Sequence, residues 1–132
     1  MRALIVDDSR AIRTIVRGIL RPLGFETIEA GHGREALERL REGGPVELAL
    51  IDWNMPEMNG FELVKALRAD AANDATRLMM ITTETDLADV ARALEAGANE
   101  YLMKPFTRQV VEGKLALLGL GVGPGGEGGS RG

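Results

Sequence analysis

The chain contains no cysteine, and His32 is its only histidine among 132 residues. Without thiols there is no disulfide, no thiolate nucleophile and no zinc-thiolate site, and one imidazole is too few for a histidine metal cluster. Any metal ion that this chain binds is therefore expected to have oxygen ligands.

Long apolar runs and a basic excess are also missing. No run approaches the roughly 18 residues of a membrane span, and Met1 stands directly before the first predicted strand, which leaves no room for a signal peptide. With 16 basic and 20 acidic residues, the formal charge is -4, unlike the basic surfaces that bind nucleic acid or anionic membranes. We therefore expect a cytoplasmic protein whose partners are neither nucleic acid nor membrane.

Length and composition predict one domain followed by a tail. The 132 residues, 45% of them hydrophobic, suffice for a single core. We expect the domain to occupy residues 1–118. Residues 119–132 include eight glycines, a composition typical of a flexible tail.

Short apolar runs alternate with helical patterns along the chain. Residues 3–6, 46–51 and 78–81 are almost continuously apolar, which predicts strands covered on both faces of a parallel sheet. Residues 25–29 and 101–103 mix apolar and polar side chains, which predicts edge strands. The intervening segments predict five helices, so the order is (βα)₅ and the fold class is α/β, a parallel sheet between two helix layers.

Helix-spaced apolar residues and capping residues mark those helices. The first is expected to end at the Gly24 turn and the fourth before Gly97, and the others to cover 34–40, 61–67 and 107–118. The apolar stripe of the first helix comprises Ile12, Ile15, Val16, Ile19, Leu20 and Leu23, and that of the fourth Leu87, Val90, Ala91 and Leu94. The expected N-caps are Ser9, Thr85 and Thr107.

Polar residues follow four of the five predicted strands. Asp7 and Asp8 come after the first strand, Asp52 after the third, Thr82 after the fourth and Lys104 after the fifth. Ligands of parallel α/β sheets bind at the carboxyl ends of the strands. The sequence alone leaves the strand order open, but the order 2-1-3-4-5 would bring these five groups into one cleft.

The types of these residues point to phosphoryl chemistry. Two carboxylates about 4 Å apart repel by roughly 4 kcal/mol at an effective dielectric constant near 20, which a bound cation would offset. Three carboxylates suit Mg²⁺, and a carboxylate such as Asp52 can attack phosphorus to form an aspartyl phosphate. Lys104 and the Thr82 hydroxyl could then hold the phosphoryl oxygens.

Four motifs resemble the receiver domain of two-component response regulators, and within that family the single-domain, CheY-like chemotaxis regulators. The resemblance covers residues 2–118 and implies a flavodoxin-like doubly wound sheet with strand order 2-1-3-4-5. The motifs are Val6-Asp7-Asp8, Asp52-Trp53-Asn54-Met55-Pro56-Glu57-Met58-Asn59-Gly60, Ile81-Thr82-Thr83-Glu84 and Lys104-Pro105-Phe106.

The resemblance implies a role for each matching site residue. Asp52 would accept a phosphoryl group from a histidine kinase or phosphotransfer domain, and Thr82 and Lys104 would contact that group. Mg²⁺ would be held by Asp7, Asp8, Asp52 and the backbone carbonyl of Asn54. The Lys104-Pro105 bond is commonly cis in the family, although X-Pro bonds are cis in only about 5% of cases generally.

Regulation and output are implied in the same way. Tyr101 would change rotamer together with Thr82 and remodel the face of the fourth helix, fifth strand and fifth helix, where an output protein such as a flagellar motor switch would dock. Asn54 and Glu84 lie two residues beyond Asp52 and Thr82, and we expect them to tune the lifetime of the phosphoryl group. Such a protein is a phosphoacceptor that assists its own phosphorylation and dephosphorylation rather than an enzyme acting on other substrates.

Three minor positions complete these expectations. His32 stands where the family often has Asp and is expected to be a surface turn residue, and Ser9 stands where the CheY-like members have an aromatic residue. Trp53 is expected to be a partly exposed packing residue beside the site.

Other readings stay open at this stage. The chain could be a receiver of a pathway other than chemotaxis, a piece of a multidomain regulator, or an unphosphorylated binding module. The Asp7-Asp8-Ser9 segment could simply cap a helix. An aspartyl-phosphate phosphatase of the haloacid dehalogenase type is disfavoured because Asn54 stands where that family needs a second Asp, and flavodoxin-like FMN binding because no loop offers a phosphate cradle.

Overall fold

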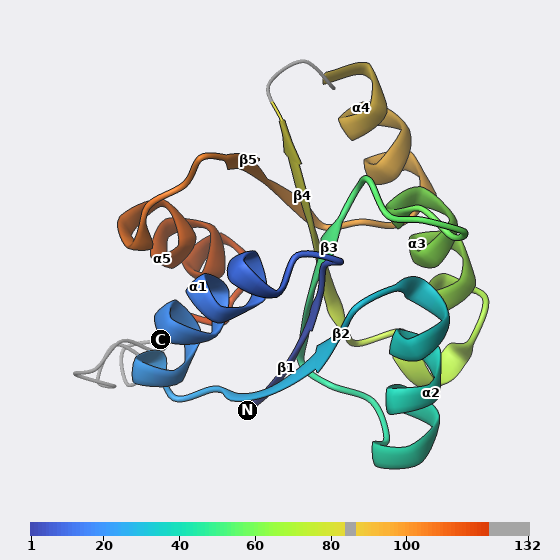
Figure 1. Ribbon diagram of the computed structural model, residues 1–132, viewed down its shortest axis with the longest axis horizontal. Helices are drawn as coiled ribbons and strands as arrows, with labels where there is room; N and C mark the ends of the chain where they lie inside the picture. Colours follow the sequence, from blue (N-terminus) through green and yellow to red (C-terminus); the bar gives the residue numbers. More distant parts are fainter. Residues whose placement is uncertain (84–86, 122–132) are drawn as a thin grey trace.

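The computed structural model describes residues 1–83 and 87–121, which form a parallel sheet covered by helices on both faces (Figure 1). Its strands pair in the order β2-β1-β3-β4-β5. The predicted α/β fold and the strand order implied by the resemblance are both confirmed. The strands are β1 (Arg2–Val6), β2 (Glu26–Ala30), β3 (Leu48–Asp52), β4 (Arg77–Thr83) and β5 (Glu100–Lys104).

The helices divide between the two faces of the sheet. Figure 1 shows α1 and α5 together on one face and α2, α3 and α4 on the other. The α-helices are α1 (Arg10–Leu20), α2 (Gly33–Gly43), α3 (Gly60–Arg68), α4 (Leu87–Ala96) and α5 (Arg108–Leu117), and short 3₁₀ helices cover Arg21–Leu23 and Ala71–Asn73. The 3₁₀ helix Arg21–Leu23 follows α1 directly, and the predicted turn at Gly24 ends it with a φ of 100°.

Each central strand contributes to two cores. Along β3, Ala49 and Ile51 join the core under α2, α3 and α4, whereas Leu48 and Leu50 join the core under α1 and α5. Because successive strand residues point to opposite faces, only a continuously apolar run can fill both cores. The more polar β2 and β5 are the two edge strands, as predicted.

The strands extend further than the apolar runs indicated. Asp52 and Lys104 are the last residues of β3 and β5, and Thr82 lies within β4, so these three residues do not follow their strands as expected. The parallel ladder continues to these positions, with Asp52 opposite Ile81 and Lys104 opposite Thr83. Backbone pairing therefore holds the polar residues at the carboxyl edge of the sheet.

Two predicted helix stripes were partly wrong. In α4, Leu87 is 58% and Leu94 41% exposed, and Val90 and Ala93 are the buried residues. Only a narrow stripe of α4 reaches β4 and α3, and the small Ala93 permits that close approach. In α1, Val16, Ile19 and Leu20 already fill the side facing the sheet, which leaves Ile15 52% exposed.

Several helices begin at a residue whose side chain caps the first turn. The Ser9 hydroxyl accepts from the Ile12 amide and the Thr107 hydroxyl from the Val110 amide, each at 3.2 Å, so both predicted caps are confirmed. His32 is exposed as expected but also caps α2, because its Nδ1 accepts from the Glu35 amide at 3.2 Å. The third predicted cap, Thr85, lies outside the described residues.

The beginning of the predicted tail is hydrogen-bonded to α5. The Gly119 amide donates to Ala116 at 3.1 Å and the Leu120 amide to Leu115 at 2.8 Å, a Schellman arrangement in which Gly119 has a φ of 79°. Leu120 also packs against the core under α1 and α5. Among the described residues, no helix has the length and apolar character needed to cross a bilayer.

Candidate functional site

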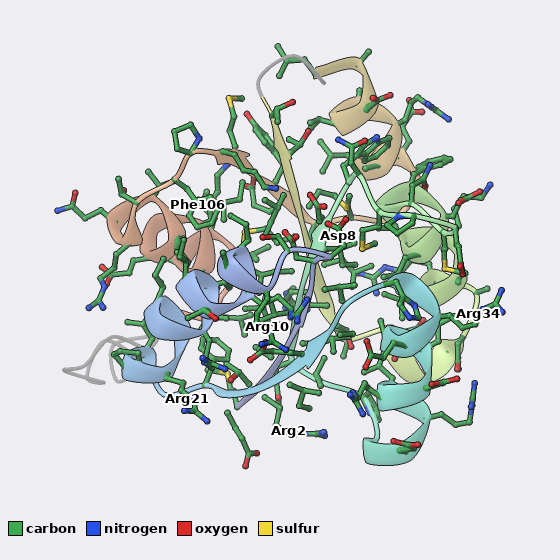
Figure 2. All side chains as sticks on the ribbon, viewed as in Figure 1. Arg2, Asp8, Arg10, Arg21, Arg34 and Phe106 are labelled. Atoms are coloured by element: carbon green, nitrogen blue, oxygen red, sulfur yellow. The ribbon has the colours of Figure 1, made fainter. Side chains whose placement is uncertain are left out.

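Three carboxylates meet at the carboxyl edge of the sheet. Asp7, Asp8 and Asp52 can each offer one oxygen such that all three oxygens lie within 4.8 Å of one another. Asp7 and Asp52 are buried, at 1% and 5% exposure, whereas Asp8 is exposed. Figure 2 shows Asp8 at this edge, at the opposite end of the sheet from Arg2. The structure therefore brings together the acids that the sequence singled out.

Several hydrogen bonds fix Asp7 just beyond the end of β1. Its amide donates to the Ala30 carbonyl at 3.1 Å, which extends the pairing with β2. Its Oδ1 accepts from the Ser9 amide at 2.8 Å, and its backbone carbonyl accepts from Nη1 of Arg13 at 2.6 Å. The orientation of the Asp7 carboxylate thus depends on the local turn, on β2 and on α1.

Asp52 is held by close packing between the end of β3 and the start of α3. The Gly60 amide donates to the Trp53 carbonyl at 2.9 Å, and a Cβ on Gly60 would lie 2.5 Å from the Asp52 carbonyl oxygen. Only glycine permits this approach. Trp53 was expected to be partly exposed but is only 7% exposed, because its ring packs in the core and lies 5.9 Å from the Phe61 ring.

Lys104 reaches the carboxylates from β5. Its Nζ lies 3.2 Å from Oδ1 of Asp52 and 3.8 Å from Oδ2 of Asp7. The Lys104-Pro105 bond is cis. The lysine therefore supplies positive charge directly between two buried acids.

Thr82 lies on β4, between the strands that carry Asp52 and Lys104. Its side chain is buried at 2% exposure, and its hydroxyl lies 3.3 Å from the Thr83 carbonyl. Asn54 is exposed in the segment after β3. The remaining proposed tuning residue, Glu84, lies outside the described residues.

Tyr101 is half-buried on β5, close to α5. Nζ of Lys114 lies 4.1 Å from the centre of the Tyr101 ring and donates to Oε1 of Glu100 at 2.8 Å. The same Glu100 oxygen accepts from the Tyr101 amide at 3.0 Å. A cation thus lies over the ring of the residue that the sequence analysis proposed as a switch, and a carboxylate binds its backbone amide.

Burial and mutual repulsion make both inner acids harder to ionise. Burial, and after it the charge of the neighbouring Asp7, raise the pKa of Asp52 to about 6, even though Lys104 acts to lower it. Burial also raises the pKa of Asp7, although the Ser9 amide and Lys104 lower it in part. One lysine therefore does not fully compensate the negative charge gathered here.

The donor set fits a hard divalent cation. Oδ2 of Asp7 is buried and accepts no hydrogen bond from any described residue. A buried polar atom without a hydrogen-bond partner normally lowers the stability of the fold unless a ligand binds it. Carboxylate oxygens are the ligands that Mg²⁺ prefers, and Mg²⁺ usually keeps several waters, which the exposed Asp8 side of the site allows.

Sequence reasoning missed the residues that support the acids. Arg13 binds the Asp7 carbonyl, and Glu29 on β2 accepts from Nε of Arg13 at 3.1 Å and from Nη1 of Arg17 at 2.6 Å. The alternation of polar and apolar residues in β2 indicated that Glu29 lies beside a helix. No local sequence pattern connects Glu29 to Asp7. These contacts join residues that are brought together only by the fold.

Comparison with known proteins identifies the family. The model of the response regulator receiver domain matches residues 3–116. The chain belongs to this family. Its members are signalling proteins that generally bind Mg²⁺, and the receiver domain described here is a phosphorylation-activated switch of a two-component system.

Relatives and solved structures agree with this assignment. The receiver domain is 46% identical over 119 residues to the chemotaxis protein CheY1 of Helicobacter pylori (strain ATCC 700392 / 26695), covering 89% of this chain and 96% of that protein. It is 46% identical over 127 residues to a CheY homolog of Campylobacter jejuni (strain 81-176), covering 95% and 98%. The structure of Vibrio cholerae CheY4 is 36% identical, with a TM-score of 0.82 and coverage of 89% and 97%.

Proposed function

We propose that this receiver domain accepts a phosphoryl group on Asp52 from a histidine kinase or phosphotransfer domain. An oxygen of Asp52 attacks phosphorus, the bond from phosphorus to the donor nitrogen breaks, and the imidazole leaves with that electron pair. The proposal is supported chiefly by one observation, the meeting of three carboxylates with the ammonium group of Lys104 in one partly buried site.

The acids would hold the divalent ion that this transfer needs. Asp7, Asp8 and Asp52 provide side-chain oxygens, and the backbone carbonyl of Asn54 is the fourth proposed ligand. Bound Mg²⁺ would supply charge neutralisation for the phosphoryl oxygens. The buried Oδ2 of Asp7, which accepts no hydrogen bond from any described residue, supports this assignment.

Lys104 and Thr82 are the proposed phosphoryl contacts. In the unmodified protein Nζ of Lys104 forms an ion pair with Asp52 at 3.2 Å, so it is already placed to bind an oxygen of the incoming group. The Thr82 hydroxyl, on the strand next to β3, would donate to another oxygen. A charged group with these new partners can supply energy for a conformational change.

The output would pass through Tyr101 to the face formed by α4, β5 and α5. Leu87 and Leu94 on α4 and Leu117 on α5 are exposed apolar side chains on those elements, suited to protein contact. We infer that phosphorylation shifts Tyr101 and Thr82 together and alters this face. Because the relatives are chemotaxis proteins, we propose chemotaxis as the pathway and a flagellar motor switch as one candidate for the docking protein.

Two further expectations complete the proposal. Residues 1–118 are the functional unit, and the remaining glycine-rich segment is a tail. Asn54 and Glu84 set the lifetime of the phosphoryl group by facing the water that attacks it. If replacement of Glu84 by alanine left the dephosphorylation rate unchanged, its part in this proposal would be wrong.

Intact mass spectrometry tests the chemistry directly. The full chain is incubated with Mg²⁺ and acetyl phosphate, which should add one phosphoryl group to the wild type and none to Asp52→Asn. Asp74→Asn is a matched control, because Asp74 is an exposed acid just before β4, at the opposite end of the sheet from the site. Modification of Asp52→Asn to the wild-type extent would overturn the assignment of the phosphoacceptor.

Binding to an output protein tests the pathway separately. A flagellar motor switch protein should bind the acetyl phosphate-treated chain more tightly than the untreated chain, and this difference should vanish for Asp52→Asn. Phosphorylation without any such difference would favour a receiver of another pathway or a piece of a larger regulator.

A further inference from the structure

A partly buried arginine, Arg13, contacts the acid-bearing segment from outside the cleft. Nη1 of Arg13, in α1, donates to the backbone carbonyl of Asp7 at 2.6 Å. That oxygen belongs to the peptide group that joins Asp7 to Asp8. Because a peptide group is planar, a hydrogen bond that orients its oxygen also orients the backbone from which both carboxylates project.

The arginine is itself held in place by β2. Its Nε donates to Oε1 of Glu29 at 3.1 Å, and the side chains of Arg13 and Glu29 are only 16% and 26% exposed. The second Glu29 oxygen accepts from Arg17, one turn further along α1, at 2.6 Å. A planar guanidinium with donors in a rigid fork can bind a carboxylate and a carbonyl at once.

The remaining contacts of Asp7 leave its Oδ2 directed into the site. The amide of Asp7 is bound to Ala30 and Oδ1 to the Ser9 amide. With its carbonyl held by Arg13, the residue is fixed at three points, and Oδ2 is the atom that lies 3.8 Å from Nζ of Lys104. We propose that Arg13 is a positioning residue that preorganises Asp7 and Asp8 to bind a divalent cation.

The positive charge of Arg13, considered by itself, should weaken Mg²⁺ binding, which is the opposite of a positioning effect. An arginine near a cation site repels the cation, so loss of its charge would strengthen Mg²⁺ binding if electrostatics dominated. If positioning dominates, loss of Arg13 weakens binding, as outer partners of metal ligands usually do. The sign of the change therefore separates the two effects.

The inference rests on the proposed function only in assuming that these acids bind Mg²⁺. Calorimetric titration of the metal-free full chain with Mg²⁺ measures that binding without phosphorylation. Arg13→Gln should bind about tenfold more weakly than the wild type. Arg10→Gln, which removes an equal charge from the exposed first residue of α1 labelled in Figure 2, should leave the affinity within about twofold or make it slightly tighter.

A second readout needs no metal. The Ser9 amide donates to Oδ1 of Asp7, so its hydrogen exchange should accelerate in Arg13→Gln and not in Arg10→Gln. Arg13→Lys keeps the charge but cannot bridge Glu29 and the Asp7 carbonyl with a planar fork. It should also bind Mg²⁺ more weakly than the wild type, and it provides the test if Arg13→Gln fails to fold.

Specific results would overturn the inference. One such result is Mg²⁺ binding by the Arg13 variants that is as tight as in the wild type or tighter. The other is a loss of Mg²⁺ affinity in Arg10→Gln equal to that in Arg13→Gln. If the wild type binds Mg²⁺ and is phosphorylated while Arg13→Gln binds Mg²⁺ equally well, only this inference fails. If the wild type binds Mg²⁺, with the expected loss in Arg13→Gln, but accepts no phosphoryl group, the proposed function fails and the positioning role stands.

Discussion

Nζ of Lys104 lies 3.2 Å from Oδ1 of Asp52, although β4 separates the two strands that carry them. The lysine side chain passes over the end of the intervening strand to reach the acid. Since Asp7 is also within 3.8 Å of this ammonium group, one cation serves two buried carboxylates. The unmodified site therefore retains a surplus of negative charge that a divalent ion can relieve.

Replacement of Asp52 by asparagine should stabilise the metal-free protein. The change removes a buried charge that repels Asp7, and we expect the free energy of unfolding at neutral pH to rise by about 1–3 kcal/mol. Urea unfolding with a chelator present measures this difference. Addition of Mg²⁺ should stabilise the wild type more than the variant. A variant less stable than the wild type without metal would show that no surplus repulsion exists.

Gly60→Ala should destabilise the fold where α3 meets β3. The added Cβ would lie 2.5 Å from the Asp52 carbonyl and 3.0 Å from Cα of Trp53, so the backbone must shift at a cost of about 2–4 kcal/mol. Gly18→Ala is the matched control, because Gly18 lies within α1 with nothing within 4 Å of a new Cβ. That variant should gain about 0.5–1 kcal/mol. Equal effects of both changes on thermal unfolding would contradict this packing argument.

Thr82→Ala should uncouple Tyr101 from the phosphorylation site. Tyr101 is the only tyrosine of the chain, so fluorotyrosine labelling gives a single ¹⁹F resonance. Acetyl phosphate with Mg²⁺ should shift this resonance in the wild type. In Thr82→Ala the shift should be largely lost even when mass spectrometry shows a phosphoryl group, because the proposed hydroxyl contact is absent. Thr83→Ala, altered at the exposed neighbour, should keep the shift; its loss there as well would argue against a specific role of Thr82.

Glu35 should contribute acid-sensitive stability at the start of α2. Its Oε1 accepts from the Gly31 amide at 2.7 Å, and this hydrogen bond lowers the pKa of Glu35 below its usual 4.5, with a smaller contribution from Arg39. A carboxyl group whose pKa is lower in the folded state stabilises the fold above the unfolded-state pKa, and this contribution is lost as the pH falls through the folded-state value. Glu35→Gln should therefore cost about 0.5–1 kcal/mol at pH 7, and this cost should shrink as the pH falls below 4.5.

The pH series needs its own control. Glu38→Gln, which changes an exposed glutamate further along α2, is the matched control. Urea unfolding midpoints at several pH values measure both differences. A stability difference for Glu35→Gln that grows as the pH falls would contradict the assigned sign.

The alternation of strands and helices and the edge of the sheet that carries the acids could be predicted from local sequence, whereas the strand order was implied only by the family resemblance. Between their end residues the central strands are continuously apolar, because each strand is covered on both faces, and this pattern can be recognised in the sequence. Asp7, Asp8 and Asp52 interrupt or end such runs, so they had to lie at the edge of the sheet where strands terminate. The chemistry of the site then followed from residue type.

Exposure on the helices depended on how each helix is rotated against its neighbours. Leu94 and Ile15 fit a helical apolar stripe as well as Val90 and Val16 do, yet only the last two are buried. The width of the buried stripe on a helix depends on how closely the neighbouring elements pack against it. The helical spacing of apolar residues carries no information about that distance.

Arginine contacts were equally hidden in the sequence. Arg68, in α3, donates to the carbonyls of Gly97, Asn73 and Thr76 and to Oδ1 of Asn99. These hydrogen bonds join the α3–β4 and α4–β5 connections at the end of the sheet opposite the acids. Nothing in the sequence distinguishes Arg68 from a solvated surface arginine.

The sequence by itself determined which residues can carry phosphoryl chemistry and on which edge of the sheet they lie, because strand periodicity and residue type are local properties. Only the tertiary structure determined how the side chains of those residues are oriented. The reach of Lys104 across β4 and the hold of Arg13 on Asp7 are contacts made across the fold, and their geometry exists only when α1, β2 and β5 are packed together.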